Sequence, residues 1–89
     1  MSSFMLVRHK VMNFKEWKGG YDDHLSKRVE AGLTEKYLLH GISDPNEVVI
    51  LFEAKDLDRA RSFAASQDLK DRMRVVGVVD KPDIYFLES

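Results

Sequence analysis

The chain has 89 residues, of which 44% are hydrophobic and 33% are charged, and this composition is that of one folded globular domain over residues 1–89. Its formal net charge is −1 and its basic and acidic residues are interspersed, which argues against nucleic-acid binding. The absence of cysteine excludes disulfides, thiolate catalysis and cysteine-based metal sites. The apolar run Phe4–Val7 is too short for a signal peptide or a membrane span, so we expect a cytoplasmic protein without membrane contact.

Residues 4–11 alternate as in a β-strand, and one face of that strand is an apolar row that includes a histidine: Met5, Val7, His9 and Val11. A helix is expected to begin after Asn13, which can cap it, and to run to about Ala31. Its apolar stripe would consist of Phe14, Trp17, Tyr21, Leu25 and Ala31, with Val29 at the edge. The pair Gly19 and Gly20 should weaken the middle of this helix, and Gly32 should end it.

Residues 33–42 predict a second strand, and the turn residues Asp44, Pro45 and Asn46 join it to a third strand as a β-hairpin. The third strand, Glu47–Ala54, is apolar on both faces. Its side chains alternate, with Val48, Ile50 and Phe52 on one face and Val49 and Leu51 on the other. We therefore expect this strand to be covered on both sides.

The second half of the chain predicts a broken helical connection and a last strand. Asp56 caps a first helix with a short apolar face made of Leu57, Ala60, Phe63 and Ala64. Ser66 caps a second short helix that carries Leu69, Met73 and Val76 and ends at Gly77. Residues 83–88 then form the final strand.

The order strand, helix, strand, strand, helix, strand predicts an α+β ferredoxin-like fold. Right-handed crossovers place both helical segments on one face of a four-stranded antiparallel sheet. The other face is apolar in all four strands, so we expect a homodimer in which two sheets pack through that face. A monomer with an exposed apolar sheet is the alternative. The pattern leaves open which face of residues 47–54 meets the helices.

Four segments carry a resemblance to a known superfamily: Val7–Val11, Phe14–Lys18, Asp44–Val49 and Gly77–Glu88. With them the whole chain resembles small bacterial proteins of the dimeric α+β barrel superfamily, which includes antibiotic-biosynthesis-monooxygenase-like domains. The resemblance implies a homodimer with its ligand pocket between helices and sheet. Quinone-forming monooxygenases of the superfamily use an aromatic-lined pocket without metal or flavin, so the resemblance implies no cofactor. The Asn, Trp and His set of haem-degrading members is not matched in position.

Candidate site residues follow one another along the first helix. Trp17, Tyr21, His24 and Arg28 are spaced by four, three and four residues and so form one ridge. Trp17 and Tyr21 provide flat apolar area, His24 could transfer a proton, and Arg28 could hold an anion. His9 could face the same cavity. The helical spacing favours the alternative that Trp17 and Tyr21 are core and that His24 and Arg28 flank it in solvent. No two histidines have metal-ligand spacing on one element, so no metal site is expected.

These residues predict a small-molecule-binding protein with cofactor-independent, monooxygenase-like activity on an aromatic or polyketide-like compound. His9 or His24 would be the base, and Trp17 or Tyr21 would position the ring. The alternative is a non-catalytic homodimeric binding or scaffold module. The catalytic hypothesis requires a cavity of about 300 Å³ or more that is not filled by Leu25, Phe63 and Met73.

Overall fold

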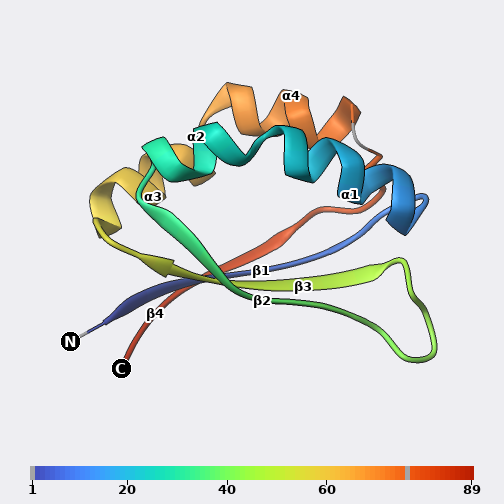
Figure 1. The fold of residues 1–89 in the computed structure, drawn as a ribbon, viewed down its shortest axis with the longest axis horizontal. Helices are drawn as coiled ribbons and strands as arrows, with labels where there is room; N and C mark the ends of the chain where they lie inside the picture. Colours follow the sequence, from blue (N-terminus) through green and yellow to red (C-terminus); the bar gives the residue numbers. More distant parts are fainter. Residues whose placement is uncertain (1, 76) are drawn as a thin grey trace.

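The computed structural model describes residues 2–75 and 77–89, which form one four-stranded sheet with a layer of helices over it (Figure 1). No helix in these ranges is long and apolar enough to cross a membrane. In chain order the elements are β1 (Ser3–Lys10), α1 (Phe14–Asp23), α2 (Leu25–Glu30), β2 (Leu33–His40), β3 (Glu47–Ala54), α3 (Leu57–Ala64), α4 (Gln67–Val75) and β4 (Asp83–Glu88).

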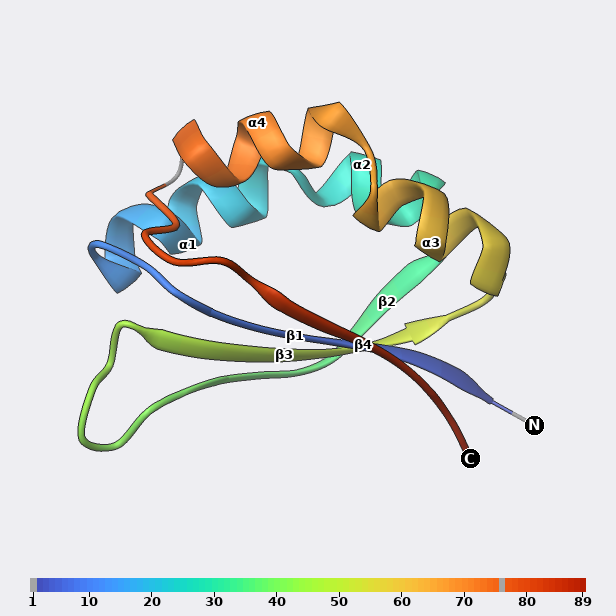
Figure 2. The same cartoon turned by 180° about the vertical axis from the view of Figure 1, so that it is seen from behind.

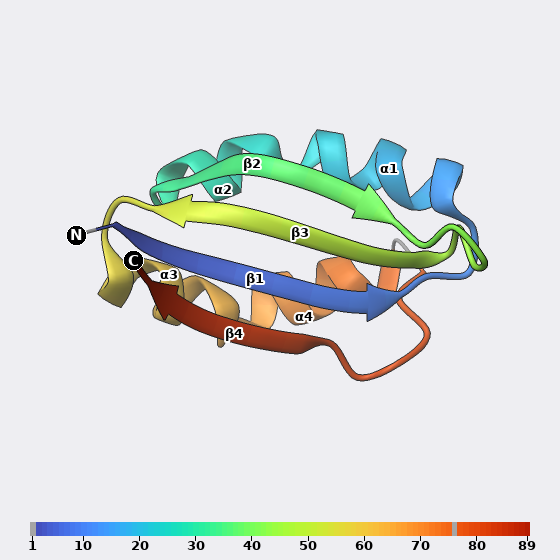
Figure 3. The ribbon, with the colours of Figure 1, turned by 90° about the horizontal axis from the view of Figure 1, so that it is seen from below.

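The strands are antiparallel in the order β2-β3-β1-β4, which confirms the ferredoxin-like fold expected from the sequence. All four helices of the described chain lie on one face of the sheet, as Figure 2 shows from behind. From below, α1 and α2 follow the β2 edge of the sheet, and α3 and α4 follow the β4 edge (Figure 3). The opposite face carries no helix.

The two central strands decide which side chains meet the helices. In the β1–β3 pairing, Val7 lies opposite Ile50 and His9 lies opposite Val48. All four are buried, so Val48, Ile50 and Phe52 form the helix-facing set that the sequence left unassigned. Burial of this apolar row against the helices is the main source of stability in a domain of this size. The core of the described chain consists of Met5, Val7, Val11, Trp17, Tyr21, Ala31, Leu33, Val48, Ile50, Phe52, Ala54 and Ala60.

The first helix is shorter than the sequence suggested. The prediction that it runs to about Ala31 was wrong, because α1 ends at Asp23 and α2 begins at Leu25. The break lies at His24, where φ is −92° and ψ is 8°, and not at the glycine pair. The carbonyl of Tyr21 accepts the N–H of His24 at 3.2 Å and the guanidinium of Arg28 at 2.6 Å, which satisfies the end of α1.

The break also changes which residues of α2 face the sheet. Leu25 and Val29 are 55% and 62% exposed, although the sequence placed them on or beside the apolar stripe, whereas Arg28 is buried. A stripe drawn at 100° per residue holds only while the helix is continuous. Leu25 and Val29 therefore drop out of the expected stripe, whereas its last member, Ala31, is buried in the core as expected.

The expected helix caps are present. The side chain of Asn13 accepts the N–H of Glu16, and the carboxylate of Asp56 accepts two N–H groups of the first turn of α3. The hydroxyl of Ser66 accepts the N–H of Leu69 at 3.2 Å, so the second crossover is broken as predicted. The predicted position of Val76 in this helix lies outside the described residues. None of the residues of α4 is buried.

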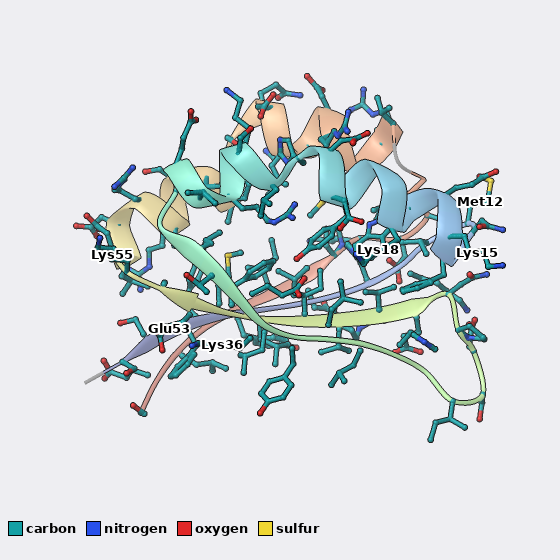
Figure 4. All side chains as sticks on the ribbon, in the orientation of Figure 1. Met12, Lys15, Lys18, Lys36, Glu53 and Lys55 are labelled. Carbon is teal, nitrogen blue, oxygen red and sulfur yellow. The ribbon has the colours of Figure 1, made fainter. Side chains whose placement is uncertain are left out.

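The open face of the sheet is apolar at its centre and charged on one side. Its exposed or half-buried apolar side chains are Phe4, Leu6, Tyr37, Leu39, Val49, Leu51, Tyr85 and Leu87. Figure 4 shows side chains projecting from this side of the sheet, with Glu53 labelled among the charged ones. The guanidinium of Arg8 pairs with three carboxylates, on Asp83, Glu47 and Asp80, at 2.9, 3.2 and 3.4 Å. The face is therefore less uniformly apolar than the sequence pattern suggested.

Candidate functional site

A cavity lies between the helices and the covered face of the sheet. Its volume is about 50 Å³. It brings together all five predicted site residues, which come from β1, α1, the break at His24 and α2. The lining consists of Met5, Val7, His9, Trp17, Gly20, Tyr21, His24, Arg28, Ile50, Phe52, Phe63, Leu69, Arg72 and Met73.

One wall of the cavity is a pair of aromatic rings from successive turns of α1. The rings of Trp17 and Tyr21 stack with centroids 4.8 Å apart and planes inclined by 24°. The hydroxyl of Tyr21 donates to a carboxylate oxygen of Glu35 at 2.7 Å. Burial and this hydrogen bond raise the pKa of Tyr21, so its hydroxyl stays protonated. Tyr21 therefore offers the cavity a ring face rather than an acid or base.

His9 lies at the sheet side of the cavity and is 2% exposed. Its ring meets that of Trp17 edge-on, with centroids 5.4 Å apart. Neither ring nitrogen has a hydrogen-bond partner among the described residues. Burial lowers the pKa of His9 to about 4, against the opposing charge of Asp80, so the ring is neutral at pH 7. A buried imidazole without a partner is uncommon and calls for an explanation.

Arg28 is buried to 6% exposure, so the expectation that it lies in solvent is wrong. Its guanidinium carbon lies 3.6 Å from the centroid of the Tyr21 ring, a cation–π contact, and one Nη donates to the Tyr21 carbonyl. Burial lowers the pKa of Arg28, which nevertheless remains a cation. Within the described chain no carboxylate oxygen lies within ion-pair distance of it.

The side chain of His24 also lines the cavity and is mostly buried, with 11% of it exposed. Its ring stacks on Phe63 with centroids 5.9 Å apart, and its Nε2 lies 3.2 Å from a carboxylate oxygen of Asp68 on α4. Unlike His9, His24 therefore has a partner. Both histidines line the same cavity. That they act together on a ligand stays a prediction.

Arg72 is a lining residue that sequence reasoning missed. It belongs to α4, where it lies three residues after Leu69 and next to Met73, two of the apolar positions expected in that helix. Its Nη2 donates to the carbonyl of Gly20 at 3.0 Å and thereby ties α4 to α1. Phe63 and Met73 line the cavity as the sequence suggested they could, whereas Leu25 is exposed. Its spacing from Leu69 could have placed Arg72 on the inner side of α4, and the topology, which brings the two crossovers side by side, could have placed it near α1.

The electrostatic character of the cavity follows from its lining. Apolar side chains make up most of it, and the charged residues among them are Arg28 and Arg72. No Asp or Glu belongs to the lining. In the described ranges, no three His, Asp or Glu side chains come together as a metal site would require. The chemistry open to this lining is hydrogen bonding by imidazole, stacking on aromatic rings and electrostatic attraction of an anion.

No protein-family model matches the sequence, and no curated protein matches it either. Solved structures are similar over nearly the whole chain. SnoaB, a cofactor-independent oxygenase from Streptomyces nogalater, has a TM-score of 0.75 at 13% identity, with 99% of this chain and 92% of that chain covered. A Bordetella bronchiseptica protein provisionally classed as an antibiotic biosynthesis monooxygenase has a TM-score of 0.76 at 14% identity, with coverage of 100% and 98%.

A conserved protein from Methanosarcina mazei has a TM-score of 0.71 at 14% identity, with 98% of this chain and 92% of that chain covered. Identities this low establish a shared fold and leave activity to be argued from the site. The fold implied by the four resembling segments is thus confirmed: the chain has the ferredoxin-like α+β fold of the antibiotic-biosynthesis-monooxygenase-like structures.

Proposed function

We propose that the protein binds a hydroxylated aromatic compound in the cavity beside His9 and oxygenates it with O₂ and without a cofactor. The observation that carries this proposal is the neutral, buried imidazole of His9, whose two ring nitrogens have no partner among the described residues. A ligand hydroxyl would satisfy one of them. The stacked rings of Trp17 and Tyr21 would hold an aromatic ring against the wall of the cavity.

The first step is removal of a proton from the ligand hydroxyl by His9. With a pKa of about 4, His9 alone is a weak base for a phenol, whose pKa is about 10. Two unit charges ~4 Å apart interact by about 4 kcal/mol at an effective dielectric constant of about 20. This corresponds to about three pKa units. A phenolate beside His9 raises the pKa of the imidazole, and the positive charge of Arg28 lowers the pKa of the phenol, so both changes narrow the gap between the two pKa values.

The reaction then balances without any further reactant. The phenolate gives electrons to O₂, and one oxygen atom bonds to the ring carbon para to the hydroxyl. The second oxygen atom leaves as water with the ring hydrogen and the hydroxyl hydrogen. The aromatic compound is oxidised by four electrons to a quinone, and O₂ is reduced by the same four. The mostly apolar lining of the cavity suits this chemistry because it limits the access of water to the reactive anion.

The size of the cavity sets a condition on this function. At about 50 Å³ it is several times smaller than the ~300 Å³ that an organic ligand requires. The space condition of the catalytic hypothesis is thus not met in this conformation, where Phe63 and Met73 take up much of the room. Binding requires α4 to move outward. None of the residues of that helix is fully buried, but Leu69 and Met73 line the cavity, so the ligand must replace their apolar contacts when the helix moves.

We further propose that the active form is a homodimer joined through the open face of the sheet. Tyr37, Leu39, Tyr85 and Leu87 are each between 46% and 62% exposed there, around the half-buried Val49 and Leu51. Apolar patches of this kind on soluble proteins are commonly interfaces. A two-fold axis would pair the face with its own copy.

A non-catalytic homodimeric module is the second candidate, and the small volume of the cavity favours it. In such a module His9 would be a structural residue held neutral by burial. The two candidates differ in whether the cavity opens to a ligand and whether His9 changes the rate of a reaction.

Oxygen uptake with 1,4-dihydroxynaphthalene, with no metal or flavin added, distinguishes the two. This probe already carries a hydroxyl at the para carbon, so its oxidation to the naphthoquinone transfers two electrons and two protons to O₂, which becomes H₂O₂. Uptake above the buffer rate therefore reports base-initiated electron transfer to O₂, the step that precedes oxygen insertion. We expect His9→Gln to lower the enzymatic rate by at least about tenfold, and the exposed His40→Gln to leave it unchanged. A rate equal to that of buffer, or one that His9→Gln does not alter, overturns the oxygenase proposal.

A further inference from the structure

Three buried side-chain nitrogen or oxygen atoms in the described part of the chain have no hydrogen-bond partner, and all three belong to residues that line the cavity. Two are the ring nitrogens of His9, and the third is Nε of Arg72. Buried polar atoms in folded proteins are nearly always paired. The concentration of the unpaired ones around a single cavity therefore points to a ligand that pairs with them.

The terminal Nη2 atom of the Arg72 guanidinium contacts α1. Its Nη2 donates to the carbonyl of Gly20 at 3.0 Å and lies 4.0 Å from a carboxylate oxygen of Asp23, whose side chain is 81% exposed. These contacts fix the guanidinium between α4 and α1 and leave the Nε–H group free to donate. A buried N–H of a cation is a strong donor, most of all to an anionic oxygen.

Arg28 contributes a second cation to the same lining, and its guanidinium is engaged by the Tyr21 carbonyl and ring rather than by a carboxylate. The lining holds no Asp or Glu, so its two positive charges are not neutralised within the cavity. The carboxylates that contact lining residues, on Asp23, Glu35 and Asp68, all belong to exposed residues. Removing a charge from water is costly unless an opposite charge compensates it, and this applies to the buried Arg28. Arg72, whose side chain is 32% exposed, adds a second positive charge to the lining, and the two together favour an anion in the cavity.

We propose that the cavity takes a planar organic anion with a carboxylate or phenolate oxygen, and that Arg72 binds this oxygen through Nε–H with Arg28 as the second cation. The inference rests on the proposed function, since it names the class of compound bound at the same site. It also gives α4 a role: when the helix moves outward to admit the ligand, Arg72 gives up its bond to the Gly20 carbonyl and binds the anion instead.

Benzoate and benzamide test the proposal, because they share shape and aromatic area and differ in charge. We expect titration of the wild type at pH 7 and fixed ionic strength to give benzoate a dissociation constant at least about tenfold below that of benzamide, as for hydrogen bonds to a charged group. The ring resonances of His9 in an NMR spectrum report whether either probe reaches the cavity. Equal affinities with shifted His9 resonances overturn the anion inference and leave the proposed function standing. Binding of neither probe, with His9 unperturbed, overturns both.

Arg72→Gln and Arg74→Gln form the matched pair of variants. Both remove one positive charge from α4, but Arg74 is exposed and is not part of the lining. We expect Arg72→Gln to abolish the preference for benzoate and Arg74→Gln to retain it. Arg72→Lys keeps the charge and much of the packing, so it should keep part of the preference and serves if the glutamine variant is poorly folded. A preference that both glutamine variants lose equally, or both keep, overturns the role of Arg72.

Discussion

Neighbouring charged and polar residues differ in their hydrogen-bond and ion-pair partners between the two faces of the sheet. Arg8 and His9 are adjacent on β1 and point to opposite sides. On the open side Arg8 pairs with three carboxylates, which raise its pKa. On the covered side His9 is buried without a partner, and its pKa is lowered to about 4. A fold selected for stability alone would pair the buried group first.

This contrast indicates that the two faces of the sheet have different functions. The open face has apolar residues around a satisfied ion cluster, which suits contact with a second subunit. The covered face keeps its unpaired polar atoms around a cavity, which suits a ligand. Both faces are built from the same two central strands, and neighbouring residues of β1 or β3 lie on opposite faces. Substitutions at two adjacent positions should therefore affect different functions, one ligand binding or folding and the other assembly.

Ile50→Lys should have the largest effect. Ile50 lies in the middle of the helix-facing row and is 2% exposed. A lysine there buries an unpaired ammonium, which costs several kcal/mol against a total stability of about 5 to 10 kcal/mol. We expect the subunit to unfold, with loss of the far-ultraviolet circular dichroism signal at 25 °C. A variant that melts within a few degrees of the wild type contradicts this assignment of the faces.

Leu51→Lys is the matched change one residue along and should act on assembly. Leu51 lies on the open face, so the lysine remains in water in a monomer. In a two-fold dimer both subunits carry the substitution. It should weaken the free energy of association by at least about 4 kcal/mol, which raises Kd roughly a thousandfold. We expect light scattering to give a folded monomer for the variant and a dimer for the wild type. A monomeric wild type at micromolar concentration refutes the dimer proposal.

Lower pH should destabilise the protein through His9. The unfolded chain binds a proton on His9 as pH falls through about 6.5, whereas the folded chain does so only near 4. The contribution of neutral His9 is therefore complete above pH 6.5 and is lost progressively between 6.5 and 4, up to about 3 kcal/mol. Urea unfolding at pH 7 and pH 4.5 measures the loss.

His9→Leu is the control for this dependence. Leucine doesn't titrate and leaves no buried nitrogen unpaired, so the variant should be at least as stable as the wild type at pH 7. Its stability should fall less between pH 7 and 4.5 because the His9 contribution is absent. Equal pH dependence in the two proteins means that His9 titrates normally in the folded state.

The sequence was sufficient to predict the order of strands and helices, the caps at Asn13, Asp56 and Ser66, and the alternation of β1 and β3. Each of these depends on residues close together in the chain, where local rules apply. The placement of Trp17, Tyr21 and His9 around shared space also followed, because an apolar row on a strand and an aromatic stripe on a helix must meet in this fold.

The missed features all depend on long-range packing. The break at His24 occurs where the guanidinium of Arg28 bonds the Tyr21 carbonyl, and no proline or cap signal in this segment predicts it. Helical spacing places Arg28 on one ridge with Tyr21 but does not decide whether its side chain is buried or lies in solvent. The place of Arg72 depends on how the second crossover lies against the first, since its Nη2 bonds Gly20 across 52 residues of sequence. Helical spacing alone predicts neither hydrogen bond.

The smallest expected effect concerns the ion cluster on the open face. Arg8→Leu leaves Glu47, Asp80 and Asp83 without their shared cation, and in a dimer two such clusters would lie on the joined faces. Because exposed ion pairs contribute little to the free energy of association, the Kd of the dimer should rise only about threefold to tenfold at low ionic strength. Salt should reduce the loss, since the Debye length falls to about 10 Å at 0.1 M. Arg74→Leu removes the same charge from α4, away from the sheet, and should leave Kd unchanged. Equal Kd values for the two variants at low salt would show that the cluster lies outside the interface, and the dimer would then have to use the apolar side chains of the open face without it.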